Sequence, residues 1–295
     1  MVKTKSKTKK KSKTKTTTKT IKRSHVKKTK NMCVACKGIS IDKVIKTNNN
    51  IVSSWLKDKN YIQDFIDKTP LKPYKQSSTN MSLTLNLSKD HKGAHVLFFA
   101  SQPVKSDKNP NTMLMKPSKH AYGDFKNSGV TKVDKNNNVT FHFNCPQCYI
   151  DDIGDNNKLP ETFYRHIHFC ISNKDNTKWT NSLYTKIVIC ELSYKDTMQH
   201  LKNGTSILIN ALPSEYYAKA HIPNSYNLFK DTIKKMSQKE LLQWFEEVLV
   251  NYPKLHKLVK QKKLHIYELP IITYCAHDKC SASYDATIEL LKKGF

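Results

Sequence analysis

A cysteine near the end of the chain lies in a setting that ionises thiols. Cys275 directly follows the apolar run 270–274, and a helical pattern starts a few residues later and closes at Gly294. This order predicts a buried strand, a tight loop and a helix N-terminus next to the sulfur. A helix N-terminus favours negative charge and lowers a thiol pKa. The sequence therefore predicts a nucleophilic thiolate at Cys275.

Two histidines in the middle of the chain have the spacing of metal ligands. His166 and His168 alternate with apolar residues in the stretch 164–169. Side chains two positions apart in a strand project to one face, which brings the two imidazoles together. Neighbouring imidazoles suit iron, copper or zinc. The alternative is a histidine pair that faces a polar surface or solvent.

Four of the eight cysteines form two Cys-x2-Cys pairs, Cys33 with Cys36 and Cys145 with Cys148. Two such pairs often build a zinc site, although usually closer together in sequence. The alternative is free thiols. The N-terminus lacks the apolar segment of a secretory signal, so we expect an intracellular, cytoplasm-like reducing compartment with all eight thiols reduced.

The N-terminal segment is strongly basic. Residues 1–30 contain 14 Lys or Arg and no acid, and the remaining residues keep +13 of the net charge of +27. Such a segment buries too little apolar surface to fold, so we expect a disordered tail over residues 1–31. Without aromatic residues that stack on bases, residues 1–30 would contact a polyanion only non-specifically. A solvated, solubilising tail is the alternative.

Composition also indicates a source. Lys and Asn are abundant, while Arg23 and Arg165 are the only arginines. This bias suits an AT-rich genome, such as that of a giant virus or a protist, and a viral protein would be a candidate for the virion. No apolar run approaches the roughly 18 residues of a membrane helix, so we expect no membrane span.

Periodicity divides the chain after the tail into three parts. Residues 32–79 read as a linker region with one or two short helices. Residues 80–190 alternate with period two between turn residues, which predicts an antiparallel β-sandwich. In residues 191–295 strands alternate with helices, which predicts an α/β domain with a central parallel sheet.

The last part carries an ordered set of motifs. A buried strand, 206–211, is followed by Glu215-Tyr216, by His221-Ile222-Pro223, by a helical pattern from Ser237 to about Leu249, and by the strand that leads into Cys275. This set, closed by Gly294-Phe295, resembles the rhodanese-like family over about residues 191–295. The loop length after Cys275 matches the sulfur-transferring members, since the phosphatase-like relatives have one residue more.

Two positions depart from the family pattern. Asn210-Ala211-Leu212 stands where the family usually has Asp-x-Arg, and Cys280 stands where the six-residue loop usually ends in Arg. The Cys-x4-Cys-x-Ala-Ser form is similar to a subgroup with a second cysteine at that position. We interpret His221 as a structural hydrogen-bonding residue rather than a base.

The resemblance implies sulfur transfer. Cys275 would accept a sulfane sulfur as a persulfide, and Cys280 would act as a resolving thiol or as an inert replacement for Arg. The loop amides would form a nest for the sulfur and for an anionic donor, with positive charge from two of its side chains. The implied catalytic residues are Cys275 and Cys280, and the implied binding loop is Ala276, His277, Asp278, Lys279 and Ser281. No cofactor is required, and the partners are a small anionic sulfur donor and a thiol acceptor.

The middle part, about residues 80–190, is similar to the β-sandwich of the intradiol dioxygenases. In that family two tyrosinates and a His-x-His pair hold ferric iron, and Tyr149, His166 and His168 match three of these ligands. The second tyrosine is expected at about Ser106, so one ligand is missing, and Arg165 is displaced from the position of the family arginine. The resemblance implies iron or another metal on this domain.

The sequence supports three hypotheses about function. The leading hypothesis is a sulfurtransferase that works through a Cys275 persulfide. The first alternative is a non-catalytic rhodanese-like binding or regulatory protein, because both family arginine positions are changed. The second is a metal-dependent oxygenase on the sandwich domain.

Overall fold

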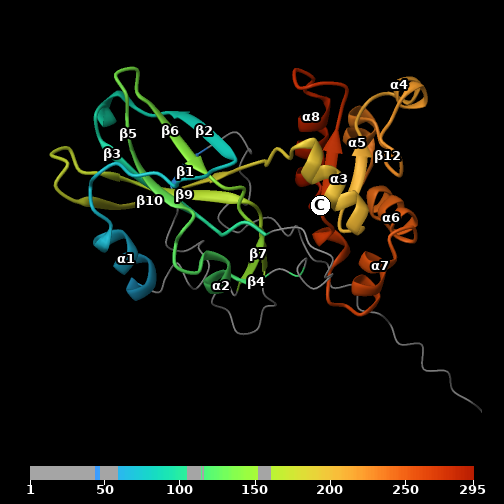
Figure 1. Cartoon of the computed structure of the whole chain (residues 1–295), viewed down its shortest axis with the longest axis horizontal. Helices are drawn as coiled ribbons and strands as arrows, with labels where there is room; N and C mark the ends of the chain where they lie inside the picture. The colour runs from blue at the N-terminus through green and yellow to red at the C-terminus, as the bar shows by residue number, and fades with distance from the viewer. Residues whose placement is uncertain (1–43, 47–58, 105–113, 115, 152–160) are drawn as a thin grey trace, which may run out of the picture.

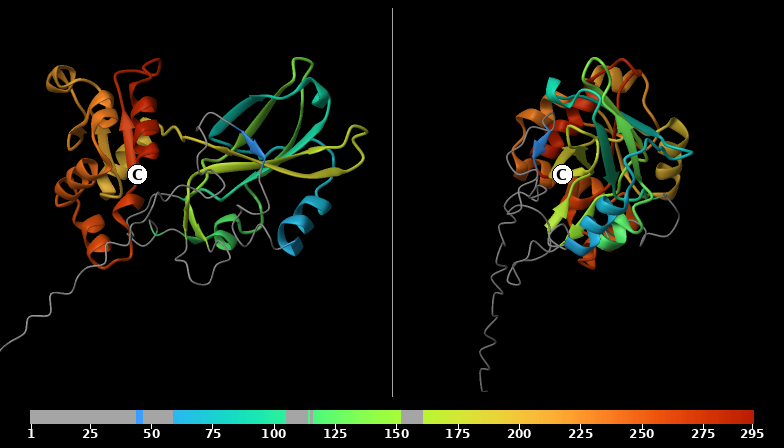
Figure 2. Two further views of the ribbon diagram at one scale, coloured as in Figure 1. Left: turned by 180° about the vertical axis from the view of Figure 1, so that it is seen from behind. Right: turned by 90° about the vertical axis from the view of Figure 1, so that its left-hand side faces the viewer.

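The computed structural model describes residues 44–46, 59–104, 114, 116–151 and 161–295 (Figure 1). The basic tail, Cys33, Cys36 and Ser106 therefore lie outside the described residues. The described chain folds into a mainly β part, up to residue 187, and a C-terminal α/β part, which lie beside one another (Figures 1 and 2).

The first part is built on a five-stranded sheet in the order β1-β10-β9-β3-β5, in which every pairing is antiparallel. A two-stranded antiparallel sheet, β2-β6, and a small sheet, β4-β7-β8, complete it. Its strands are β1 (Ile45–Lys46), β2 (Met81–Asn86), β3 (His95–Ala100), β4 (Lys116–Pro117), β5 (Ser128–Lys132), β6 (Asn138–Phe143), β7 (Tyr149–Asp151), β8 (Glu161–Phe163), β9 (His166–Ser172) and β10 (Trp179–Ile187). Its helices are α1 (Lys59–Lys68), the short 3-10 helix η3 (Lys89–His91) and α2 (Ser118–Tyr122).

Both faces of the large sheet are covered. Along β3, Val96 and Phe98 pack in one apolar cluster with β2 and β6, while Leu97 and Phe99 pack in another with α1 and α2. The alternation of strand side chains produces this division. The prediction of antiparallel strands from period-two patterning agrees with this part, but the pattern gave no sign of α2 or of the parallel pair β4–β7. Ile45–Lys46, which lie in the linker region expected to contain one or two short helices, pair as a strand with β10.

The second part has a three-stranded sheet in the order β12-β11-β13, and its strands run parallel. Its elements are α3 (Tyr194–Asn203), β11 (Ile207–Asn210), α4 (Ser214–Lys219), β12 (Tyr226–Asn227), α5 (Lys230–Lys235), α6 (Gln238–Leu249), α7 (Pro253–Lys260), the 3-10 helix η5 (Ile266–Glu268), β13 (Ile271–Tyr274) and α8 (Ala282–Lys292). Because the strands are parallel, β11, β12 and β13 all end at one edge of the sheet.

Local signals set the helix ends in this part. The Ser193 side chain caps α3, which ends at Gly204 in the left-handed conformation, and Ser237 with Glu240 forms a capping box at the start of α6. Each pairing satisfies backbone groups that a helix end leaves unpaired. The predicted helix from Ser237 to about Leu249 is therefore confirmed.

The two parts touch through α8 and η5. Ile288 and Leu291 of α8 pack against the apolar cluster on the α1/α2 side of the large sheet. The Thr162 hydroxyl donates to Glu268 Oε1 at 2.8 Å. The helix that begins at the Cys275 loop is thus also a contact between the two parts.

The prediction that all eight cysteines are reduced thiols is wrong for one pair. Cys145, in the loop after β6, forms a disulfide with Cys190, just beyond the end of β10. The strands that precede them, β6 and β10, belong to different sheets, so this disulfide joins residues 45 positions apart in sequence across two sheets. Cys145 is therefore not available as a thiolate, and a zinc site built from both Cys-x2-Cys pairs does not fit. The free cysteines of the described residues are Cys148, Cys170, Cys275 and Cys280.

No helix within the described ranges is both long and apolar enough to cross a membrane.

The packing of β5 on β3 gives a prediction for stability. A Cβ on Gly129 would lie 2.5 Å from the Phe98 ring and 3.1 Å from the Tyr74 carbonyl oxygen. We expect Gly129→Ala to lower the free energy of unfolding by about 1–3 kcal/mol, the usual cost of overpacking, in a urea titration. His142→Ala, on an exposed position of β6, is the control and should change it by less than about 0.5 kcal/mol. Equal unfolding midpoints for wild type and Gly129→Ala would contradict this packing.

Candidate functional site

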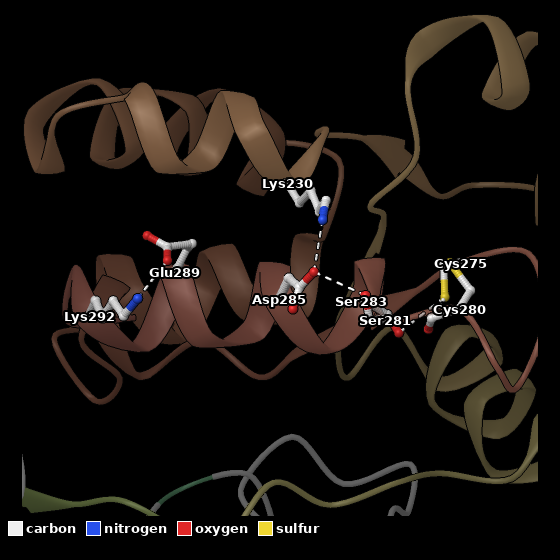
Figure 3. A network of polar contacts seen from close by, with 8 residues as sticks. All are labelled: Lys230, Cys275, Cys280, Ser281, Ser283, Asp285, Glu289 and Lys292. Atoms are coloured by element: carbon white, nitrogen blue, oxygen red, sulfur yellow. Dashed lines mark hydrogen bonds and ion pairs between the residues drawn. The ribbon is translucent and has the colours of Figure 1, made fainter. Parts of the chain in front are cut away.

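The Cys275 loop lies at the carboxyl edge of the parallel sheet. Tyr274, the last residue of β13, accepts a backbone hydrogen bond from Ala211 N at 2.9 Å, which aligns the ends of β13 and β11. The Thr273 hydroxyl donates to the Ser283 carbonyl at 2.9 Å and so joins the end of the strand to the first turn of α8. The chain between these anchors forms a short loop with Cys275 at its start and Cys280 near its end (Figure 3).

Three oxygen atoms surround the Cys275 sulfur. Sγ lies 3.1 Å from the Cys280 carbonyl oxygen, 3.3 Å from Ser283 Oγ and 3.8 Å from the His277 carbonyl oxygen. The side chain is half-buried, so reagents from solvent can reach it. In the thiolate form, the Ser283 hydroxyl is positioned to donate to the sulfur.

The surroundings lower the pKa of Cys275. Burial raises it, but the hydrogen bonds of the Ser283 and Cys280 side chains, together with those of the main chain at Ser283 and His277, outweigh that effect. The thiolate is thus stabilised by hydrogen bonding rather than by a neighbouring cation.

The expected nest of loop amides is only partly formed. The Lys279 N–H donates to Asp278 Oδ1, and the Cys280 N–H donates to the His277 carbonyl. Ala276, His277, Asp278 and Lys279 are exposed on the loop. Ser281 donates to Asp285. Ser283, which the sequence analysis did not include in the site, lies next to the Cys275 sulfur instead. The one feature of the sequence that could have indicated it is its position in the first turn of the predicted helix.

The His-Ile-Pro element supports the loop from outside. Ile222 N donates to the Tyr274 hydroxyl at 2.9 Å, while the exposed His221 stacks on Tyr217 and contacts its carbonyl oxygen. These contacts agree with our interpretation of His221 as a structural residue. Asn210, which the resemblance described above places where the family usually has Asp, is buried, and its side chain accepts from Leu212 N.

Residues 193–295 match the family model described as the Rhodanese-like domain. The C-terminal part is a rhodanese-like domain. No curated protein and no solved structure matches the chain. The resemblance of the middle part to the intradiol dioxygenases has no support from these comparisons.

A second group of polar side chains meets inside the β part. The His166 Nε2 atom lies 3.1 Å from Tyr149 Oη, 3.2 Å from Tyr122 Oη and 3.1 Å from His168 Nε2. The structure thus brings the predicted residues Tyr149, His166 and His168 together. It adds Tyr122, from the end of α2, which sequence reasoning missed because a five-residue helix has too little periodicity to be recognised.

These four side chains are at most 2% exposed. Burial lowers the pKa of His166 to about 4 and lowers that of His168 well below its usual value. Both imidazoles are therefore neutral near pH 7, the form that binds a metal. His166 Nδ1 donates to the Tyr164 carbonyl and His168 Nδ1 contacts Thr185 Oγ1, so outer partners orient both rings.

The donor set fits a metal ion. With Nδ1 protonated, His166 Nε2 has one lone pair, yet three polar atoms surround it within 3.2 Å. Ligand atoms held about 2.0 Å from one cation lie roughly 2.8–3.4 Å apart, which matches this spacing. Groups of three or more His, Cys, Asp or Glu suited to a metal are absent from the described residues, so this set depends on its tyrosines.

The geometry at Cys275 predicts an effect of Ser283. We expect Ser283→Ala to raise the pKa of Cys275 towards that of an ordinary thiol, because the variant removes a donor to the thiolate. The measurement is the pH dependence of Cys275 alkylation by iodoacetamide, followed by peptide mass spectrometry. Ser281→Ala is the matched control, since that hydroxyl contacts Asp285 and not the sulfur. An unchanged pKa in Ser283→Ala would contradict this role.

Proposed function

We propose that the chain transfers sulfane sulfur through a persulfide on Cys275. The single observation that carries the proposal is the half-buried Cys275 sulfur at the edge of a rhodanese-like domain, with hydrogen bonds that lower its pKa. A thiolate that solvent can reach is the nucleophile that this chemistry needs.

The first half-reaction loads the sulfur. The Cys275 thiolate attacks the outer sulfur of a donor such as thiosulfate, a bond forms between the two sulfur atoms, and sulfite leaves with the electron pair of the broken bond. Ser283 donates to the sulfur that carries the charge before attack, at 3.3 Å. An acceptor thiolate or cyanide then attacks the terminal sulfur and releases the Cys275 thiolate.

Cys280 provides a second reaction for the Cys275 persulfide. Its carbonyl oxygen is 3.1 Å from Cys275 Sγ, and its side chain hydrogen bonds to the same sulfur. If the Cys280 thiolate attacks Cys275 Sγ of the persulfide, a Cys275–Cys280 disulfide forms and hydrosulfide leaves. The sulfane sulfur is reduced, the two thiols are oxidised, and a dithiol reductant resets the site.

The test compares three cysteine variants in a thiosulfate–cyanide assay. We expect Cys275→Ala to lose at least about a thousandfold in kcat/KM, because the nucleophile is gone. Cys280→Ser should still accept sulfur from the donor but should release no hydrosulfide in the absence of an acceptor. Cys148→Ser, which changes another half-exposed free thiol, is the control and should behave as wild type.

Two results would overturn the proposal. Activity in Cys275→Ala equal to wild type would exclude that sulfur as the carrier. A wild-type chain without turnover, and without modification of Cys275 by sulfane donors, would favour the alternative of a non-catalytic rhodanese-like binding domain.

A second candidate function follows from the buried tyrosines and histidines. We infer that Tyr122, Tyr149, His166 and His168 hold a metal ion, with ferric iron the best match to two phenolates and two imidazoles. Bound there, the metal would supply Lewis-acid or oxygen-dependent chemistry. The protein's own contribution is to keep the imidazoles neutral and oriented and to exclude water from the donors.

Reconstitution with iron alone tests this inference. We expect one iron per chain and a visible phenolate-to-metal absorption band, which Tyr122→Phe and Tyr149→Phe each shift or weaken and His168→Ala removes. Tyr184→Phe is the control, because that ring stacks on Phe169 at the opposite face of the sheet. Iron uptake that is unchanged in His166→Ala, or no uptake by the wild type, would exclude the site.

A further inference from the structure

The Cys275 loop has Cys280 in place of the arginine with which the family's loop usually ends, so it lacks one cation that an anionic sulfur donor would meet. Cys280 occupies the position of the family's loop arginine, and the loop's own Lys279 is exposed beside Asp278. A dianionic donor that approaches a thiolate meets electrostatic repulsion, which a nearby positive charge reduces. The described residues offer such a charge from another segment of the chain.

Lys230 lies at the same edge of the parallel sheet. It is the first residue of α5, and its N–H donates to the Ala211 carbonyl at 3.3 Å. Ala211 in turn donates to the carbonyl of Tyr274, the residue before Cys275. Two backbone hydrogen bonds thus connect the start of α5 to the end of β13.

An aspartate of α8 holds the Lys230 side chain near the loop. Lys230 Nζ is 2.8 Å from Asp285 Oδ2, and the same oxygen accepts from Ser281 Oγ at 3.2 Å (Figure 3). Ser281 directly follows Cys280, so the ion pair adjoins the end of the loop. The two side chains are 32% and 40% exposed, which leaves Lys230 open to an incoming solute.

Lys230 and Asp285 shift each other's pKa. The hydrogen bond and attraction to Asp285 raise the pKa of Lys230, and the charges of Asp231 and Cys280 add to this effect. The hydrogen bond from Lys230 lowers the pKa of Asp285. Both groups therefore stay ionised at neutral pH.

We propose that Lys230 is the cation that selects anionic sulfur donors, such as thiosulfate, at the Cys275 site, and that Asp285 is the counter-charge that limits its effect. This rests on the proposed function only for the identity of the donor. The electrostatic effect on anionic reagents at Cys275 follows from the placement of Lys230 alone.

Paired alkylating agents test the electrostatic claim without any sulfur transfer. Iodoacetate is an anion and iodoacetamide is neutral, and both attack the same thiolate. The ratio of their rate constants at Cys275, resolved by peptide mass spectrometry, cancels changes in the thiolate fraction. We expect Lys230→Met to lower this ratio by about threefold to tenfold, the effect of one charge across a partly hydrated surface.

Substitution of Asp285 should change the iodoacetate-to-iodoacetamide ratio in the opposite direction. Asp285→Asn leaves Lys230 without its counter-charge and should raise the ratio, whereas Lys230→Arg should keep it near wild type. Lys235→Met, on an exposed position of the same helix, is the control and should leave it unchanged. An unchanged ratio in Lys230→Met, or a change of the same sign in Lys230→Met and Asp285→Asn, would reduce the pair to a structural role and overturn the proposal.

The outcome is separable from that of the proposed function. If the wild type fails the thiosulfate assay while the ratios shift as expected, the site attracts anions but does not transfer sulfur. If the wild type is active and the ratios do not shift, sulfur transfer stands and Lys230 is not its selectivity residue.

Discussion

The hydrogen bond from the Thr273 hydroxyl to the Ser283 carbonyl closes the Cys275 loop at its base. It joins the end of a parallel strand to the first turn of α8, so Ser283 Oγ stands 3.3 Å from the Cys275 sulfur. The thiolate is stabilised there even though burial opposes it and part of the loop's main chain donates elsewhere. Every chemical role proposed for the domain depends on this junction of strand, loop and helix.

The two candidate sites use opposite electrostatics. At the sheet edge, a half-exposed sulfur with a lowered pKa is open to charged solutes. Inside the β part, burial keeps His166 and His168 neutral beside Tyr122 and Tyr149. The first setting suits a nucleophile and the second suits metal ligands. Both belong to one packed unit, since Ile288 and Leu291 of α8 contact the apolar cluster that includes Tyr122 and Tyr149.

Local sequence signals predicted what local physics determines. The helical pattern from Ser237 predicted α6, and alternation placed His166 and His168 on one face. The apolar run before Cys275 predicted the strand that ends next to it. Contacts between distant segments were beyond such signals. Three such contacts depend on how sheets and helices pack: the Cys145–Cys190 disulfide, the hydrogen bond between Tyr122 and His166, and the ion pair between Lys230 and Asp285. Ser283 was missed because the loop amides were expected to be the hydrogen-bond donors to the Cys275 sulfur.

The most direct measurement is mass spectrometry of the intact chain and of its Cys275 peptide after brief exposure to thiosulfate under non-reducing conditions. We expect one additional sulfur atom on Cys275, removed by cyanide, and none on the buried Cys170. A Cys275 peptide that stays unmodified while the protein is folded, or sulfur that accumulates on another cysteine, would contradict it.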